Sequence, residues 1–155
     1  MDFHISALEP EQFAPLFDLP QPFLARHLAA RRIASAKPGF VCRVSLVDAE
    51  LGEQLLLIHY THQGAASPYR ASHAIFVRKG AVRAELAIGE VPQALRARVL
   101  SLRAFDKNAM MITADLCDGD RVEKVLRTQL SNSSIAYVHI HFAKFGCYAC
   151  RADRL

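Results

Sequence analysis

The residues best suited to chemistry lie near the end of the chain. His139 and His141 are followed within a few positions by Cys147 and Cys150. Imidazoles and thiols bind zinc and related metals, and a thiolate is a strong nucleophile. The pattern makes Cys150, His139 and His141 candidate catalytic residues. It also makes His139, His141, Cys147 and Cys150 candidate zinc ligands.

The surrounding pattern predicts a strand over residues 135–142, with His139 and His141 on one face and apolar residues on the other. If the chain then turns back in a hairpin, antiparallel pairing places Cys150 opposite His139 and Cys147 on the opposite face. A turn would instead bring the two sulfurs together. Three interpretations stay open: a four-ligand zinc site, a redox dithiol, or Cys150 acting with His139 as thiol and base.

Arginine supplies most of the positive charge, since 14 of the 19 basic residues are Arg and the net charge is +4. Its planar guanidinium matches carboxylates and phosphates. The candidate ligand-binding residues are Arg43, Arg70, Arg103, Arg151, Tyr69 and Cys42. We expect at least two of these arginines to converge on one cleft around a small anionic ligand. Apart from the adjacent Arg31 and Arg32, the arginines are scattered singly, which argues against nucleic-acid binding.

Length and composition indicate a single domain over residues 1–155. The longest aliphatic run, Leu55–Ile58, is far shorter than a membrane span, and no leader pattern is present at the N-terminus. We therefore expect no membrane association and a cytoplasmic location. There the four cysteines would be free thiols or ligands. A homo-oligomer stays open.

The elements that must position these residues follow from proline placement and hydrophobic periodicity. Short helices are expected in the N-terminal part, around residues 13–17 and 23–28, and one amphipathic helix near 120–131 with Asp118 or Asp120 as its cap. Strands are expected at residues 41–46, 54–60, 74–78, 83–88, 99–105, 110–116 and 135–142. This order predicts an α+β fold with a largely antiparallel mixed sheet.

Several segments together resemble a bacterial protein family, the domain of unknown function 1203. The matching segments are Pro38–Leu46 with Asp48–Glu50, Ser67–Ser72 with Ile75–Arg78, Leu100–Asp106 with Met110–Met111, Tyr137–His141 and Gly146–Arg151. The resemblance spans nearly the whole chain. It implies a single-domain bacterial protein and no particular activity.

The sequence thus leaves the reaction unknown and does not decide whether the protein is an enzyme. The function it favours is binding of a small anionic ligand, or thiol-centred chemistry, in a cleft. The first alternative is a zinc protein that uses His-x-His and Cys-x-x-Cys. The second is a protein-interaction or homodimer module without catalysis, which would show an apolar patch or a covered sheet edge.

Overall fold

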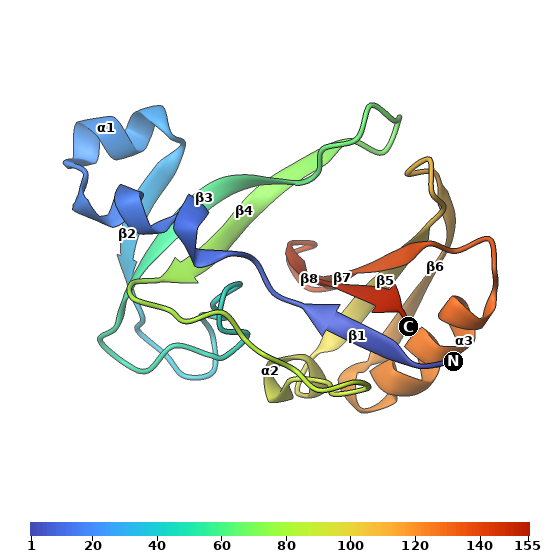
Figure 1. Ribbon diagram of the computed structural model, residues 1–155. Helices are drawn as coiled ribbons and strands as arrows, with labels where there is room; N and C mark the ends of the chain where they lie inside the picture. Colours follow the sequence, from blue (N-terminus) through green and yellow to red (C-terminus); the bar gives the residue numbers. More distant parts are fainter.

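The computed structural model describes residues 1–155, and its strands form two antiparallel sheets (Figure 1). The larger sheet has five strands in the order β1-β8-β7-β5-β6, and the smaller has three in the order β2-β3-β4. The five strands are β1 (Phe3–Ser6), β5 (Val99–Phe105), β6 (Met111–Asp118), β7 (Tyr137–Phe142) and β8 (Tyr148–Arg154). The other three are β2 (Ala29–Ile33), β3 (Gln54–Gln63) and β4 (Ala71–Arg78). The predicted α+β class is confirmed, with two sheets where one was expected.

Short helical turns cover the smaller sheet, as the N-terminal prolines predict. They are the 3-10 turns η1 (Pro10–Gln12) and η2 (Ala14–Asp18) and the helix α1 (Gln21–Arg26). Phe13 and Leu24 from this region are buried in one apolar cluster with Leu56 of β3 and Ile75 of β4. The outer strand β2 pairs with β3. Residues 10–33 therefore either cover the smaller sheet or form its outer strand.

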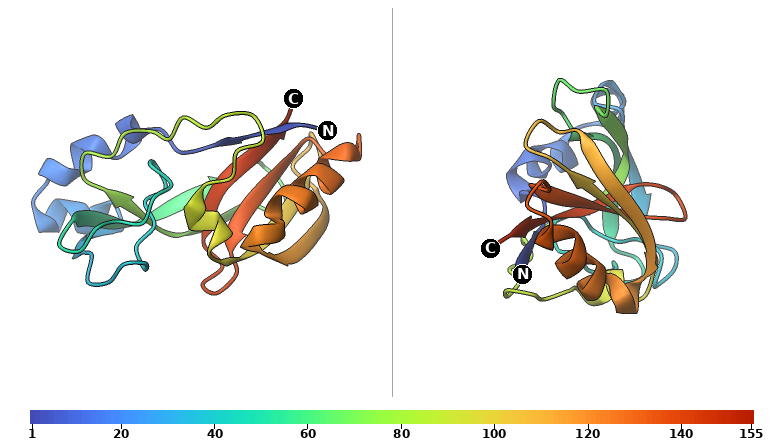
Figure 2. Two further views of the ribbon diagram at one scale, coloured as in Figure 1. Left: turned by 90° about the horizontal axis from the view of Figure 1, so that it is seen from below. Right: turned by 90° about the vertical axis from the view of Figure 1, so that its right-hand side faces the viewer.

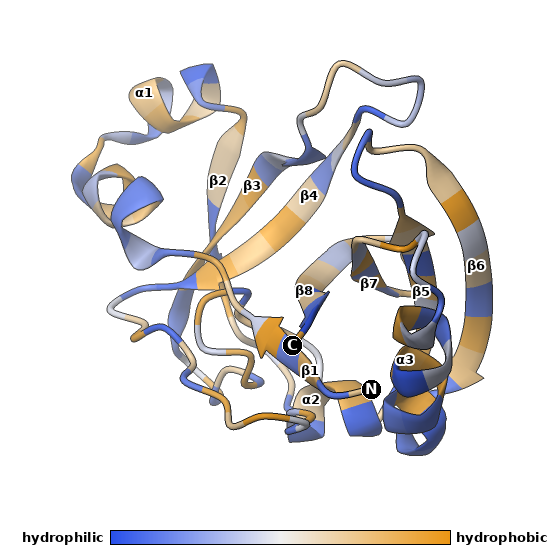
Figure 3. Ribbon diagram, turned by 45° about the vertical axis from the view of Figure 1, so that its right-hand side comes forward, coloured by the Kyte–Doolittle hydropathy of each residue, from blue (hydrophilic) through white to orange (hydrophobic).

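The predicted amphipathic helix is present as α3 (Val122–Ser131), preceded by the turn η3 (Gly119–Arg121). Figure 2 shows α3 beside the five-stranded sheet, at the far end of the molecule from α1. Figure 3 shows how hydrophobic and hydrophilic residues alternate along α3. Val122, Leu126 and Leu130 are fully buried in the core of this sheet. The 3.6-residue periodicity of the sequence thus reports the buried face correctly.

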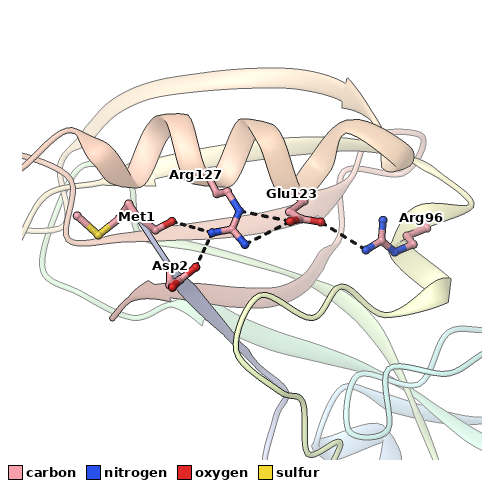
Figure 4. Close-up of polar contacts among 5 residues, drawn as sticks. All are labelled: Met1, Asp2, Arg96, Glu123 and Arg127. Carbon is pink, nitrogen blue, oxygen red and sulfur yellow. Dashed lines mark hydrogen bonds and ion pairs between the residues drawn. The ribbon is translucent and has the colours of Figure 1, made fainter.

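The predicted side-chain cap of this helix is wrong. No side chain caps α3, and Glu123 in its first turn pairs with two arginines. Figure 4 shows Arg127 between the carboxylates of Glu123 and Asp2, and Arg96 on the other side of Glu123. Arg96 ends the short helix α2 (Gln93–Arg96). These contacts join α3 to α2 and to the start of the chain.

Two predicted strands are absent, two real strands were not predicted, and β8 is present where the sequence allowed either a strand or a turn. Residues 41–46 form isolated bridges and a tight turn in which Leu46 has a φ of 54°, and residues 83–88 pair with no strand. The apolar residues alternate in these two segments because they pack against the core, and not because the segments pair as strands of a sheet. The missed strands, β1 and β2, are the short outer strands of their sheets.

Candidate functional site

The hairpin of β7 and β8 decides which chemical side chains lie together. His141 pairs with Tyr148 as expected, but the register then shifts, so that Ile140 pairs with Cys150 and His139 with Arg151. The extra residue on β8 lies between Tyr148 and Cys150 and forms a bulge, which changes the face on which later residues lie. The predicted pairing of Cys150 with His139 is therefore wrong.

The bulge places Cys150 on the same apolar face of the sheet as Cys147. Cys150 is fully buried in the same core cluster as Ile140, and this burial raises the pKa of its thiol to about 12. Cys147 belongs to the same cluster, near Phe142 as predicted, whereas His139 and His141 face the other way. All four cysteines are free, and no group of His, Cys, Asp or Glu side chains has a geometry that could hold a metal. The predicted zinc set is therefore not assembled, and Cys150 does not form a catalytic pair with a histidine.

Arg43 is the centre of the cysteine-containing region. It is only 3% exposed and has no carboxylate partner. Its Nε donates to the Tyr148 carbonyl at 2.7 Å, Nη1 donates to the Val41 carbonyl, and Nη2 lies 3.0 Å from the Cys147 sulfur. Burial lowers the pKa of Arg43 below its ordinary value, and the Cys147 thiol partly offsets this. A buried guanidinium has five N–H donors, so two remain available beyond these three contacts.

A cavity of about 400 Å³ opens beside this guanidinium. It lies where the hairpin turn between β7 and β8 meets the start of β5 and the segment before Arg43. Its lining residues are Pro38, Gly39, Val41, Arg43, Phe76, Ala97, Arg98, Val99, Phe142, Lys144, Phe145 and Cys147. We call this cavity the Arg43 pocket. A larger hollow of about 540 Å³ runs along the exposed side of α3, but it is shallow and lined only by polar residues.

The charge of the Arg43 pocket is positive. Arg43, Arg98 and Lys144 line it, and no acidic residue does. Arg98 is held from outside by Asp48, through Nη2–Oδ1 and Nη1–Oδ2 distances of 2.6 and 3.1 Å. Burial raises the pKa of Asp48, but hydrogen bonds from Arg98 and the Gly39 amide outweigh it and leave this pKa below 3.8. Because Asp48 neutralises Arg98, the uncompensated positive charge of the pocket comes from Arg43 and Lys144.

A second group of chemical residues lies on the opposite face of the five-stranded sheet. His139 and His141 of β7 meet His62 of β3, with ring centroids 6.2 and 4.8 Å from that of His62. Tyr148 stacks on His62 at 5.6 Å. The Nδ1 of His141 donates to the Gly146 carbonyl at 2.9 Å, because a carbonyl oxygen can only accept. The Nδ1 atoms of His62 and His139 are buried and have no partner.

These three imidazoles are neutral near pH 7. Burial is the main cause that lowers the pKa of His62 to about 4 and those of His139 and His141 to about 3. The Arg103 guanidinium also lowers all three pKa values. Burial disfavours the charged form of an imidazole, and a nearby cation adds to that effect.

Arg103 and Arg151 flank His139 on neighbouring strands, so two of the four candidate arginines do lie on one face. Arg151 is neutralised by Asp153 at 2.6 Å and lies over the Tyr137 ring. Arg103 makes only a 3.3 Å contact with Ser101 and has no carboxylate partner.

Arg103 has no acidic partner on the neighbouring strand β6 either. Asp115 of that strand is exposed and accepts a hydrogen bond from Gln129. Arg103 therefore leaves a positive charge uncompensated on the histidine-bearing face.

The remaining candidates from the sequence lie apart. Arg70 donates to the carbonyls of Gly64 and Ala65 and so holds its own loop together. Tyr69 packs edge-on against Phe105. Cys42 is fully buried and accepts a hydrogen bond from the Arg78 amide.

Three site residues are not among the candidates predicted from the sequence: His62, Arg98 and Lys144. His62 ends an apolar strand next to a predicted loop, a position where site residues are common, so that signal was available. Arg98 and Lys144 resemble ordinary surface residues in the sequence. Only the fold brings them beside Arg43.

The fold and these two sites define an α+β protein of two antiparallel sheets, with a cationic pocket on one side of the hairpin and a histidine cluster on the other. The chain belongs to the family described as "Protein of unknown function (DUF1203)", whose model matches residues 39–154. Two segments that carry the earlier resemblance, Pro38–Leu46 and Gly146–Arg151, meet at the contact between Arg43 and Cys147. No curated protein and no solved structure matches the chain. None of its helices is long and apolar enough to cross a membrane.

Proposed function

We propose that the protein binds a small organic anion in the Arg43 pocket, with the charged group near Arg43 and Lys144 and an apolar body against the pocket wall. The observation that carries this proposal is a cavity lined by three cationic side chains and no acidic one. Its volume of about 400 Å³ falls within the usual range for small-molecule sites. The residual N–H groups of Arg43 are suited to a carboxylate or phosphate oxygen.

The apolar residues of the pocket favour an amphipathic ligand over a bare ion. Val41, Val99, Phe142 and Phe145 supply aliphatic and aromatic surface. Phe145 is 74% exposed at the tip of the hairpin, where a ligand would cover it. A medium-chain or aromatic carboxylate has both the charge and the apolar area that this lining complements.

Matched acids and amides test this proposal. Octanoate and benzoate should raise the melting temperature of the protein, whereas octanamide and benzamide should not, because only the acids carry the charge. Lys144→Ala should weaken octanoate binding about tenfold, the loss expected for one charged contact. Val99→Trp should block binding by filling the pocket.

The control is Lys107→Ala, which removes an exposed lysine from the turn at the other end of β5. This variant should bind octanoate like the parent protein. Equal stabilisation by acid and amide would contradict the proposal. So would unchanged octanoate binding in both pocket variants.

A thiol-centred reaction is a second candidate function, favoured by the 3.0 Å contact between Arg43 Nη2 and the Cys147 sulfur. Cys147 is the one cysteine that lines the Arg43 pocket. The cationic lining should then direct a negatively charged electrophile to this sulfur. For each reagent, the alkylation rate at Cys147 is divided by the rate with a free thiol. This ratio should be higher for the negatively charged iodoacetate than for the neutral iodoacetamide. The reverse order would contradict this candidate.

We also propose a bacterial protein of a reducing compartment such as the cytoplasm. The family resemblance supports a bacterial source, and the four unpaired thiols support the compartment.

A further inference from the structure

The face of the five-stranded sheet turned toward β3 carries a positive charge without a counter-ion. Arg103 is half-buried, with Ser101 as its only hydrogen-bond partner. It lies directly across from His139 in the antiparallel ladder, so the two side chains are on the same face. His62 approaches the same ring from the other sheet. We call His62, Arg103 and His139 the histidine–arginine cluster.

We propose that the histidine–arginine cluster is a second binding site, separate from the Arg43 pocket, and that it takes a small tetrahedral oxyanion of the phosphate or sulfate type. Arg103 would supply the charge, and the unpartnered imidazole nitrogens of His62 and His139 would supply further hydrogen bonds. An oxyanion would satisfy both an uncompensated guanidinium and two buried polar atoms that lack partners.

Limited access to the buried imidazoles restricts the size of the ligand. His139 and His141 are 4% and 1% exposed, so only a ligand of a few atoms can reach the buried rings past His62 and Arg103. The charge of the cluster opposes binding of a simple cation, because Arg103 would repel it and the nearby carboxylate, Asp153, is already paired with Arg151. The Arg43 pocket differs in both respects, since it is larger and has apolar walls.

Anion binding at this cluster should be coupled to proton uptake. The groups that face the imidazoles of His62 and His139 are Arg103 and Phe105 on β5, Tyr137 and His141 on β7, and Tyr148, Arg151 and Asp153 on β8, with His73 of β4 near His62. Among these only Asp153 is acidic, and it is already paired with Arg151. A bound anion would thus be the first unpaired negative charge near the imidazoles, and it would favour their protonated form.

Sulfate is the appropriate probe because its charge stays constant from mildly acidic to neutral pH. Sulfate should bind the full-length protein in isothermal titration calorimetry, and more tightly at about pH 5.5 than at about pH 7.5. Titrations in buffers of different ionisation enthalpy should show net proton uptake on binding. Arg103→Met should weaken sulfate binding at least about tenfold.

Two controls isolate the site. Arg121→Met removes an exposed arginine with no hydrogen-bonded partner and should leave sulfate binding unchanged. Lys144→Ala, which alters the Arg43 pocket, should also leave it unchanged. His62→Gln should weaken binding and reduce its pH dependence, whereas His27→Gln at an exposed position should do neither.

The result that overturns the inference is sulfate binding that survives Arg103→Met, or the absence of sulfate binding at tens of millimolar. Loss of sulfate binding in Lys144→Ala would assign the ion to the Arg43 pocket and also overturn it. Zinc binding that depends on His62 without any sulfate binding would replace the oxyanion by a metal. Failure of octanoate to bind the Arg43 pocket leaves these outcomes unaffected, so the two proposals are tested independently.

Discussion

The ion pair between Asp48 and Arg98 connects the stability of the fold to the charge of the Arg43 pocket, and Asp48→Asn tests that connection. Asp48 accepts two hydrogen bonds from Arg98 at 2.6 and 3.1 Å and one from the Gly39 amide at 3.0 Å. The two side chains are 13% and 22% exposed. The asparagine keeps one acceptor oxygen but turns an NH₂ group toward a donor.

The loss expected from this change is about 2 kcal/mol in the free energy of unfolding. Hydrogen bonds to charged groups contribute about 1.5–3 kcal/mol each, and solvent near this partly exposed pair reduces that figure. The pKa of Asp48 lies below 3.8 in the folded protein. Its stabilisation is therefore present above about pH 4 and is lost as the pH falls through the folded pKa, so the difference from the variant should shrink there.

Urea unfolding followed by far-UV circular dichroism measures this difference, since the chain has no tryptophan. The control is Glu50→Gln, which removes an exposed ion pair with Lys37 and should cost less than about 0.5 kcal/mol. Asp48→Asn should at the same time strengthen octanoate binding, because Arg98 is released from its counter-ion. Equal stability of variant and parent at neutral pH would refute the reasoning, as would weaker octanoate binding.

Three further predictions concern the core and the buried titratable groups. The free energy of unfolding should fall as the pH is lowered from about 7 to about 5, because the unfolded chain takes up protons on histidines that stay neutral in the folded protein. Urea unfolding of His139→Gln should show a smaller fall. A pH dependence identical to that of the parent protein would contradict this. Gly119→Ala should destabilise by about 2 kcal/mol or more in the same assay, because its Cβ would lie 2.1 Å from the Leu95 carbonyl; a neutral effect would show that the backbone yields easily. In the native protein, mass spectrometry should find iodoacetamide on Cys147, which lines the pocket, well before Cys150, which is fully buried; equal labelling would contradict the observed register.

The sequence predicts those parts of the fold in which local pattern and burial agree. The helix near 120–131 and the strands β4 and β5 were recognised because their apolar periodicity reflects one buried face. The strand β2 was missed because Ala29–Ile33 is short, mostly exposed and carries two adjacent arginines. The division into two sheets depends on pairings between distant segments, which periodicity does not encode.

The candidate site was predicted in composition but not in arrangement. Arg43, Cys147, His139 and Arg103 were all singled out as chemical residues. The position of Cys150 depends on a bulge between Tyr148 and Cys150, and no glycine or proline signals that extra residue. One residue of register decides whether Cys150 lies beside His139 or is buried against Ile140, since a shift by one residue exchanges the faces of a strand.

The first 38 residues lie outside the family match, yet both sheets take an outer strand from them. β1 pairs along β8 and buries Phe3 and Ile5 completely or nearly so, and β2 pairs along β3. A fragment that begins at residue 39 would expose the unpaired backbone of both inner strands, and such open edges recruit other chains. The family boundary is therefore not a folding boundary. The N-terminal segment covers two strand edges that would otherwise be open to pairing with other chains.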